Sequence, residues 1–75
     1  SLTRQLERAR STLRPALQRQ VSLLEAAYRA GGGSLRDFLD ARRELILEDM
    51  RIIRLESRLQ VIESRLHFAY EDNQS

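Results

Sequence analysis

The only glycines of this 75-residue chain stand together, at Gly31, Gly32 and Gly33. Glycine adopts left-handed backbone conformations at little steric cost, so a run of three is the strongest helix breaker in the sequence. The segments on either side lack glycine and place apolar residues at the three- and four-residue spacing of a helix. We therefore predict a first helix over residues 1–30, a tip turn over 31–34 and a second helix over 35–72.

Both predicted helices carry a seam of apolar residues at heptad spacing. In the second helix, one row recurs every seven residues and a companion row is interrupted once, by Glu48. The rows are Leu6, Ala9, Leu13, Ala16, Gln20, Leu23 and Ala27 in the first helix, and Phe38, Leu45, Ile52, Leu59 and Leu66 with Ala41, Leu55, Ile62 and Ala69 in the second. The pattern predicts an all-α fold, a long antiparallel two-helix coiled-coil hairpin with a glycine-rich turn.

Helix-capping residues flank the predicted turn. Ser34 is placed to cap the second helix, and Asp37, three residues later, can reach back to the Ser34 amide as in a capping box. Asp37 and Asp40 lie in the first turns, where the helix dipole favours negative charge. Gly31 can take the left-handed conformation that ends the first helix. Each predicted helix therefore has its own stop or start signal.

Pro15 is the one residue that conflicts with a continuous first helix. Proline inside a helix removes a backbone hydrogen bond and costs about 3 kcal/mol. Either the helix begins near Ser11 or Thr12, or it continues through Pro15 with a kink. Because the apolar spacing is unbroken from Leu6 to Leu24, we favour the kink.

Further apolar residues on the second helix lie outside the seam. They are Leu39, Ile46 and Ile53, which repeat every seven residues one position past it, and Leu47, Met50, Val61 and Phe68. A hairpin needs one narrow stripe per helix, so we expect at least two faces of this helix to be buried. The hairpin is therefore predicted to pack sideways against other helices. The core of an ordinary four-helix bundle or of a coiled-coil dimer would explain the same pattern.

Composition argues against several functional classes. There is no cysteine, and His67 with Glu63 or Glu71 would supply only two metal ligands, so we expect no metal site. No paired nucleophile and base is apparent, and we expect neither enzyme activity nor a cofactor.

The charges of the two halves differ in sign. Residues 1–30 carry six arginines against two glutamates, and residues 31–75 carry seven arginines against nine acids. Because acids are interleaved throughout, we expect no nucleic-acid partner. No apolar run reaches the roughly 20 residues of a membrane-spanning helix.

The turn and its flanks, from Tyr28 to Leu45, resemble a signature of the TolC-like outer-membrane efflux family. The positions in register are Tyr28, Arg29, Gly31, Ser34, Asp37, Leu39, Asp40, Ala41 and Arg42. Upstream, the stretch Leu13-Arg14-Pro15-Ala16 is similar to the Leu-Pro-x-Ala stretch of the CzcC/CusC-like heavy-metal branch, which would explain why a proline is tolerated here. As a match at nine positions across a helix-turn-helix, the resemblance is fairly specific.

The resemblance implies the periplasmic part of an outer-membrane protein of a Gram-negative bacterium. In that family each protomer of a trimer contributes two helical hairpins to a twelve-helix tunnel, and this chain would be the second of the two. Its tip would dock the periplasmic adaptor (membrane-fusion) protein, through which the duct connects to an inner-membrane pump. Family members have several hundred residues, so we expect a fragment of a larger protein.

Two sets of candidate residues follow. The partner-binding tip set is Arg29, Gly31, Gly32, Gly33, Ser34, Leu35, Arg36 and Asp37. The helix-packing set is Leu39, Leu45, Ile46, Ile52, Ile53, Leu59 and Leu66. Capping geometry alone would also explain Gly31, Ser34 and Asp37. The alternative function is a self-associating coiled-coil hairpin with a purely structural scaffold role.

Overall fold

The computed structural model describes residues 1–74, which are helical apart from the first residue and one turn. Helix α1 spans Leu2–Arg8, a π-helical turn spans Ala9–Leu13, α2 spans Arg14–Arg29 and α3 spans Leu35–Gln74. No strand occurs in this part of the chain, which confirms the all-α prediction. The described chain measures 67 × 16 × 15 Å along its principal axes.

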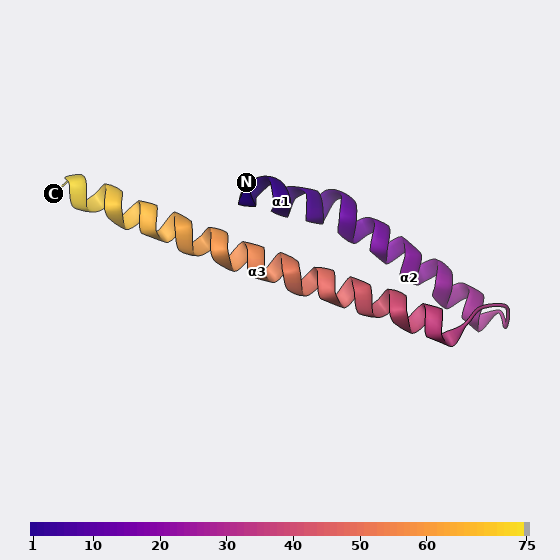
Figure 1. Cartoon of the computed structure of the whole chain (residues 1–75). Coiled ribbons are helices and arrows are strands. Elements are labelled where there is room, and N and C mark those ends of the chain that lie inside the picture. The colour runs from indigo at the N-terminus through magenta and orange to yellow at the C-terminus, as the bar shows by residue number, and fades with distance from the viewer. Residues whose placement is uncertain (75) are drawn as a thin grey trace.

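The two long helical segments lie side by side and are joined at one end, so the fold is a helical hairpin (Figure 1). The N-terminus lies beside the middle part of α3, and the C-terminal part of α3 continues past it alone (Figure 1). Leu2 and Leu59 pack against the same buried cluster at this open end of the interface. Every described residue of α3 after Leu59 is exposed, because the first helix does not extend far enough to cover it.

The helices share a thin apolar core. Its buried residues are Leu6, Ala9, Val21, Ala41, Ile52 and Leu55. The predicted α3 row is divided: Ile52 is buried, Phe38, Leu45 and Leu59 are half-buried, and Leu66 is 66% exposed beyond the end of the first helix. A core this small gives a chain of this length little stability of its own.

The register of the first helix differs from the prediction after Leu13. The heptad spacing predicts that Ala16, Gln20 and Leu23 face α3, but all three are exposed, Leu23 to 72%. In their place Leu17 and Leu24 are half-buried and Val21 is buried, each one residue later than a predicted position. Ala27, the last position of the predicted row, is half-buried as predicted. The predicted seam is therefore wrong by a single residue at Ala16, Gln20 and Leu23.

The π-helical turn accounts for the shift. The Arg14 amide donates to the carbonyl of Ala9, five residues back instead of four. A π-helical turn inserts one extra residue, so the residues after it are rotated by about 100° relative to a continuous α-helix.

Pro15 is the second residue after this turn. In a regular α-helix its ring would clash with the carbonyl of Ser11, and it has no N–H to donate to that carbonyl. The wider turn relieves this conflict, and the helix continues through Pro15. Of the two alternatives for this residue, the structure shows the continuous helix, with the discontinuity taking the form of a π-helical turn.

Two ion pairs connect the first helix to α3, one from within the π-helical turn and one from the residue that follows it. Arg14 Nε lies 2.6 Å from Asp49 Oδ1, and Arg10 lies 2.8 Å from Glu56. These side chains are about half exposed, so solvent screening leaves each pair a modest contribution of about 0–1 kcal/mol.

Glu48 interrupts the companion apolar row of α3, and its side chain is only 12% exposed. Arg51 binds its carboxylate with two hydrogen bonds of 2.9 Å, which compensates its charge. The hydrogen bonds that Arg51 donates to this carboxylate also raise the pKa of Arg51. The polar residue in the row is thus satisfied by a neighbour on its own helix.

Candidate functional site

The tip of the hairpin, residues 30–34, contains four of the eight predicted partner-binding residues, and the other four flank it. Four successive amides fold back onto the last turn of α2. Ala30 N donates to Ala26 O and Gly31 N donates to Tyr28 O, both at 3.0 Å. The amides of Gly32 and Gly33 both donate to the carbonyl of Ala27, at 3.1 and 3.0 Å. These bonds satisfy the carbonyls that the end of a helix leaves without intrahelical partners.

The three glycines of the tip have different local environments. Gly31 has φ +87°, a left-handed conformation that side chains other than hydrogen disfavour. At Gly33 an added Cβ would lie 2.8 Å from Tyr28 N and 2.9 Å from both the carbonyl carbon and the Cβ of Ala27. At Gly32 an added Cβ would have no neighbour within 4 Å. The turn therefore needs glycine at two of the three positions.

Ser34 caps the N-terminus of α3. Its hydroxyl oxygen accepts from the Asp37 amide at 3.2 Å, and its carbonyl accepts from Phe38 N at 3.2 Å. Within the described residues, the Ser34 amide donates no hydrogen bond to the Asp37 carboxylate. Only one half of the predicted capping box is formed, and Asp37 contributes its backbone amide together with a negative charge near the positive end of the helix.

We expect Ser34→Ala to destabilise the hairpin by about 1 kcal/mol, because the Asp37 amide loses its acceptor. Thermal unfolding followed by circular dichroism would measure this. Ser22→Ala, at an exposed position inside α2, is the matched control and should leave the melting temperature unchanged or slightly raised. Equal losses in both variants would contradict the capping role.

An aromatic pair joins the two helices just behind the tip. The rings of Tyr28 and Phe38 stack with centroids 6.2 Å apart, and the guanidinium of Arg42 lies 5.7 Å from the centre of the Phe38 ring. Each such contact contributes about 0.5–1.5 kcal/mol to stability, in addition to the contribution from burying the rings. The sequence analysis missed this cluster, although Tyr28 and Phe38 lie at similar distances on either side of the glycines, which is the available signal.

The predicted charged contacts of the tip are not equivalent. Arg29 forms an ion pair of 2.9 Å with Glu25 on its own helix, so part of its charge is already engaged. Arg36 and Asp37 are exposed at the start of α3, and Leu35 beside them is 46% exposed. The structure thus brings the tip set to one end of the rod, with Arg36 and Leu35 the side chains best placed to meet a partner.

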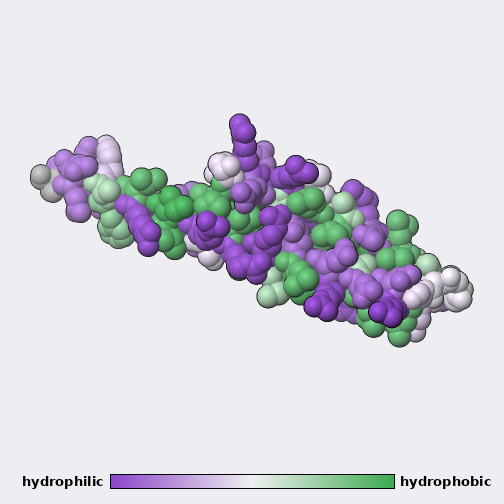
Figure 2. Space-filling model, in the orientation of Figure 1, coloured by the Kyte–Doolittle hydropathy of each residue, from purple (hydrophilic) through white to green (hydrophobic). Residues whose placement is uncertain are grey.

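A second candidate surface follows the outer side of α3. Of the predicted helix-packing set, Leu39, Ile46 and Ile53 are 47%, 52% and 61% exposed. The neighbouring Leu47, Met50, Val61 and Phe68 are exposed as well. Figure 2 shows apolar side chains on the face in view, both along the body of the rod and on the arm of α3 that extends past the first helix. We call Leu39, Ile46, Met50 and Ile53 the outer face of α3.

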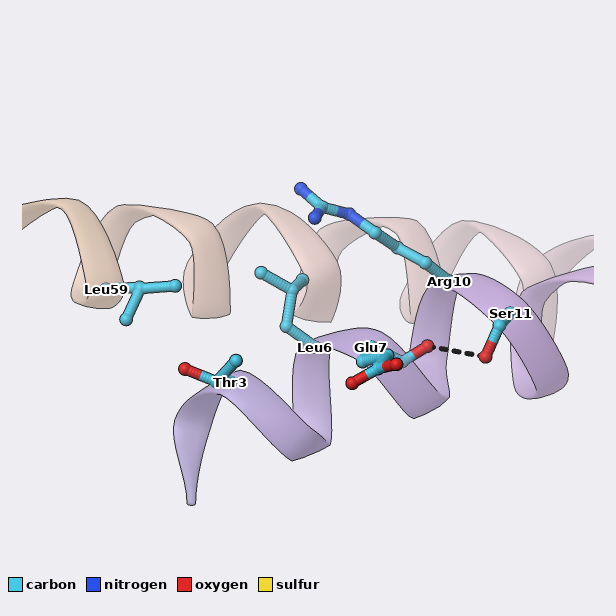
Figure 3. A pocket seen from close by; sticks show the side chains of 6 residues that line it. All are labelled: Thr3, Leu6, Glu7, Arg10, Ser11 and Leu59. Atoms are coloured by element: carbon cyan, nitrogen blue, oxygen red, sulfur yellow. Dashed lines mark hydrogen bonds between the residues drawn. The ribbon is translucent and has the colours of Figure 1, made fainter.

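A shallow depression marks the open end of the hairpin. It lies between the side chains of Leu6 and Leu59, with Thr3 and Arg10 at its edges (Figure 3). The Ser11 hydroxyl beside it donates to the Glu7 carbonyl at 2.7 Å, and Arg10 pairs with Glu56. The polar groups here bond to one another, so the depression offers no convergent set of groups for a small ligand.

Two further observations concern the rest of residues 1–74. They contain no group of three or more histidine, cysteine or acidic side chains that could hold a metal ion, and His67 pairs with Glu71 at 3.1 Å. None of their helices is both long and apolar enough to cross a membrane. Comparison with protein-family models, with curated proteins and with solved structures finds no match to this chain.

Proposed function

We propose that this chain is a tunnel hairpin of an outer-membrane efflux duct of the TolC-like kind, whose tip docks the periplasmic adaptor of a tripartite export pump. Its two helices would form an antiparallel coiled coil joined by a glycine-rich turn. The parent protein would be a trimer, and the inner-membrane pump would be reached through the adaptor. The role is one of assembly and conduction, without catalysis or a cofactor.

The observation that carries the proposal is the agreement between the turn signature and the geometry of the tip. Gly31 adopts the left-handed conformation, Ser34 caps α3, and the Asp37 amide is the group that Ser34 binds. Ala41, two positions past Leu39 in the signature, is buried between the helices at 4% exposure. Four signature positions therefore have a defined physical task in building a compact, rigid tip at the end of the rod.

The outer face of α3 gives independent support. A hairpin that stands alone exposes Leu39, Ile46, Met50 and Ile53 to water, at a cost of about 25 cal/mol for each Å² of apolar surface. A hairpin in the wall of a tunnel has a neighbour on each side that covers such surface. The small core between α1, α2 and α3 also fits a wall element that depends on its neighbours for stability.

Cysteine crosslinking tests the proposal directly, since the chain has no cysteine of its own. Arg36→Cys, at the tip, should crosslink to the cognate adaptor when both proteins are co-expressed. Arg58→Cys, an exposed α3 position far from the tip, is the matched control and should not. Absence of the Arg36→Cys crosslink in a folded, correctly located parent protein would overturn the proposal.

The exposed outer face also favours a second candidate, a hairpin that self-associates as a scaffold. Analytical ultracentrifugation of the 75-residue chain, together with transport assays of tip variants, would distinguish the two functions. A discrete dimer or tetramer of the 75-residue chain that tolerates changes at the turn would support the scaffold. A tip intolerant of substitution in transport, with no such stable oligomer, would support the duct.

A further inference from the structure

The outer face of α3 is left uncovered by the rest of residues 1–74. Its four residues are 47–61% exposed. At about 100° per residue, this face lies on nearly the opposite side of α3 from Ile52 and Leu55, which are buried in the cluster shared with the first helix. A further helix can therefore lie on the outer face without displacing the first helix.

The spacing of the outer face is that of a second heptad seam. One row holds its three members that repeat every seven residues, and Met50 stands in a neighbouring row between Arg43 and Ser57. If two copies of α3 packed here in parallel, each residue would face its own equivalent, and Arg43 would meet Arg43 of the other copy. In an antiparallel pair the two rows face each other, so that Arg43 lies opposite Ile53. The seam therefore favours an antiparallel arrangement.

Charged residues on one side of the seam select a single register. When Met50 faces Ile46 of a second copy, Asp40 faces Arg54 of that copy, and the two-fold symmetry forms this pair twice. Both side chains are exposed, and neither forms an ion pair within residues 1–74. A shift of one heptad in either direction would place Asp40 opposite Leu47 or Val61 and lose both pairs.

The charges on the other side of the seam agree with the same register. Arg42 faces Glu56 of the second copy there. Asp49 faces its own equivalent, but the guanidinium of Arg14 already binds each of these carboxylates, at 2.6 Å. The outer face thus matches a second copy of itself in both its apolar and its charged residues.

We propose that a second copy of this chain covers the outer face of α3, in an antiparallel two-fold dimer in which Met50 of each copy packs on Ile46 of the other and Asp40 pairs with Arg54. The contact extends over residues 39–57 of each copy, about 27 Å of helix. The inference rests on the second candidate function, self-association, and names its interface. The two glycine turns point in opposite directions in this dimer, so it uses the outer face differently from a tunnel wall.

Charge reversal tests the pairing, with the dissociation constant of the dimer measured by sedimentation at low ionic strength. We expect Asp40→Arg and Arg54→Asp each to weaken dimerisation about tenfold or more, because like charges then face each other twice. An equimolar mixture of the two variants should dimerise like the unsubstituted chain, since every facing pair again has opposite signs. Glu44→Arg, at an exposed α3 position away from the outer face, makes the same change of charge as Asp40→Arg and is the matched control.

Disulfide formation tests the orientation, since the chain has no cysteine of its own. The proposed register places position 39 of one copy opposite position 57 of the other. A mixture of Leu39→Cys and Ser57→Cys chains should therefore form a mixed disulfide. Either variant alone should form none, because its two cysteines lie about 27 Å apart along the dimer.

The outcomes separate this inference from the function on which it rests. A 75-residue chain that stays monomeric would overturn both the inference and the second candidate function, and would leave the duct proposal standing. A dimer that is indifferent to both charge reversals would overturn the inference while self-association stands. Disulfides formed by each cysteine variant alone, and not by the mixture, would do the same.

Discussion

Gly33→Ala is expected to destabilise the hairpin by about 1–3 kcal/mol, whereas Gly32→Ala, one residue earlier, is expected to stabilise it by about 0.4–1 kcal/mol. The Cβ at position 33 would lie 2.8 Å from Tyr28 N and 2.9 Å from two atoms of Ala27. Two of these three atoms belong to the main chain of α2, which cannot rotate away as a flexible side chain does. The turn must therefore open, and the bonds from Gly32 and Gly33 to the Ala27 carbonyl weaken with it.

Thermal unfolding followed by circular dichroism at several chain concentrations would measure the difference. For a domain of this size, 1 kcal/mol corresponds to about 4–8 °C in melting temperature, so the two alanine variants should differ by about 6 °C or more. The concentration series separates changes in the turn from changes in association. Equal melting temperatures for the two variants would show that the turn relaxes around an added methyl group. Gly33 would then be no more necessary to the turn than Gly32.

The helical content of this fold is predictable because its signals are local. Three consecutive glycines cannot continue a helix, and Ser34 before an apolar-periodic segment marks the beginning of the next one. The second-helix seam is predictable over Phe38, Leu45 and Ile52, because no irregularity interrupts the heptad spacing there. Leu66 continues the same heptad spacing but is 66% exposed in the described residues.

The first-helix seam was not predictable in the same way. The residues before and after the π-helical turn each have a regular apolar spacing, but the two spacings are offset by one residue. Read as a single α-helix, the sequence gives an apparently continuous row that passes through Gln20, and this polar residue is the visible sign of the error. Pro15 marks where the discontinuity lies, although it does not show whether a kink or an extra residue resolves it.

The candidate site is predictable in its residues and less so in its contacts. The capping role of Ser34 follows from its place in the chain, and the structure shows the expected bond to the Asp37 amide. The pairing of Arg29 with Glu25 and the stacking of Tyr28 on Phe38 depend on side-chain directions that a spacing pattern does not define. The turn requires glycine at position 33 but not at position 32, because only a Cβ at position 33 would lie too close to α2. These distances cannot be predicted from the sequence.

A pair of deletion variants gives the largest expected effect and tests the π-helical turn itself. Both are made in a Pro15→Ala background, so that a regular α-helix can form at the turn without a clash from the proline ring. Deleting Thr12 removes the extra residue of the turn and should leave Leu6, Ala9 and Val21 facing α3. Deleting Gln18, on the exposed side of α2, in addition to Thr12 should rotate the helix and place Ser22 and Glu25 where Val21 and Leu24 now pack.

The double deletion of Thr12 and Gln18 is expected to remove several kcal/mol of stability, because each buried apolar side chain that moves to the surface loses about 1.5–3 kcal/mol and a glutamate enters the seam in its place. That loss is comparable with the whole stability of a small domain, so this variant should be largely unfolded at 25 °C. The variant that lacks Thr12 alone should keep its helicity and unfold within a few degrees of its Pro15→Ala parent. Helicity and unfolding midpoints of the two variants would be measured by circular dichroism. A deletion of Thr12 alone that is as damaging as the double deletion would show that the two halves of the first helix are not related by one inserted residue, and the observed packing of Leu17, Val21 and Leu24 against α3 would need another cause.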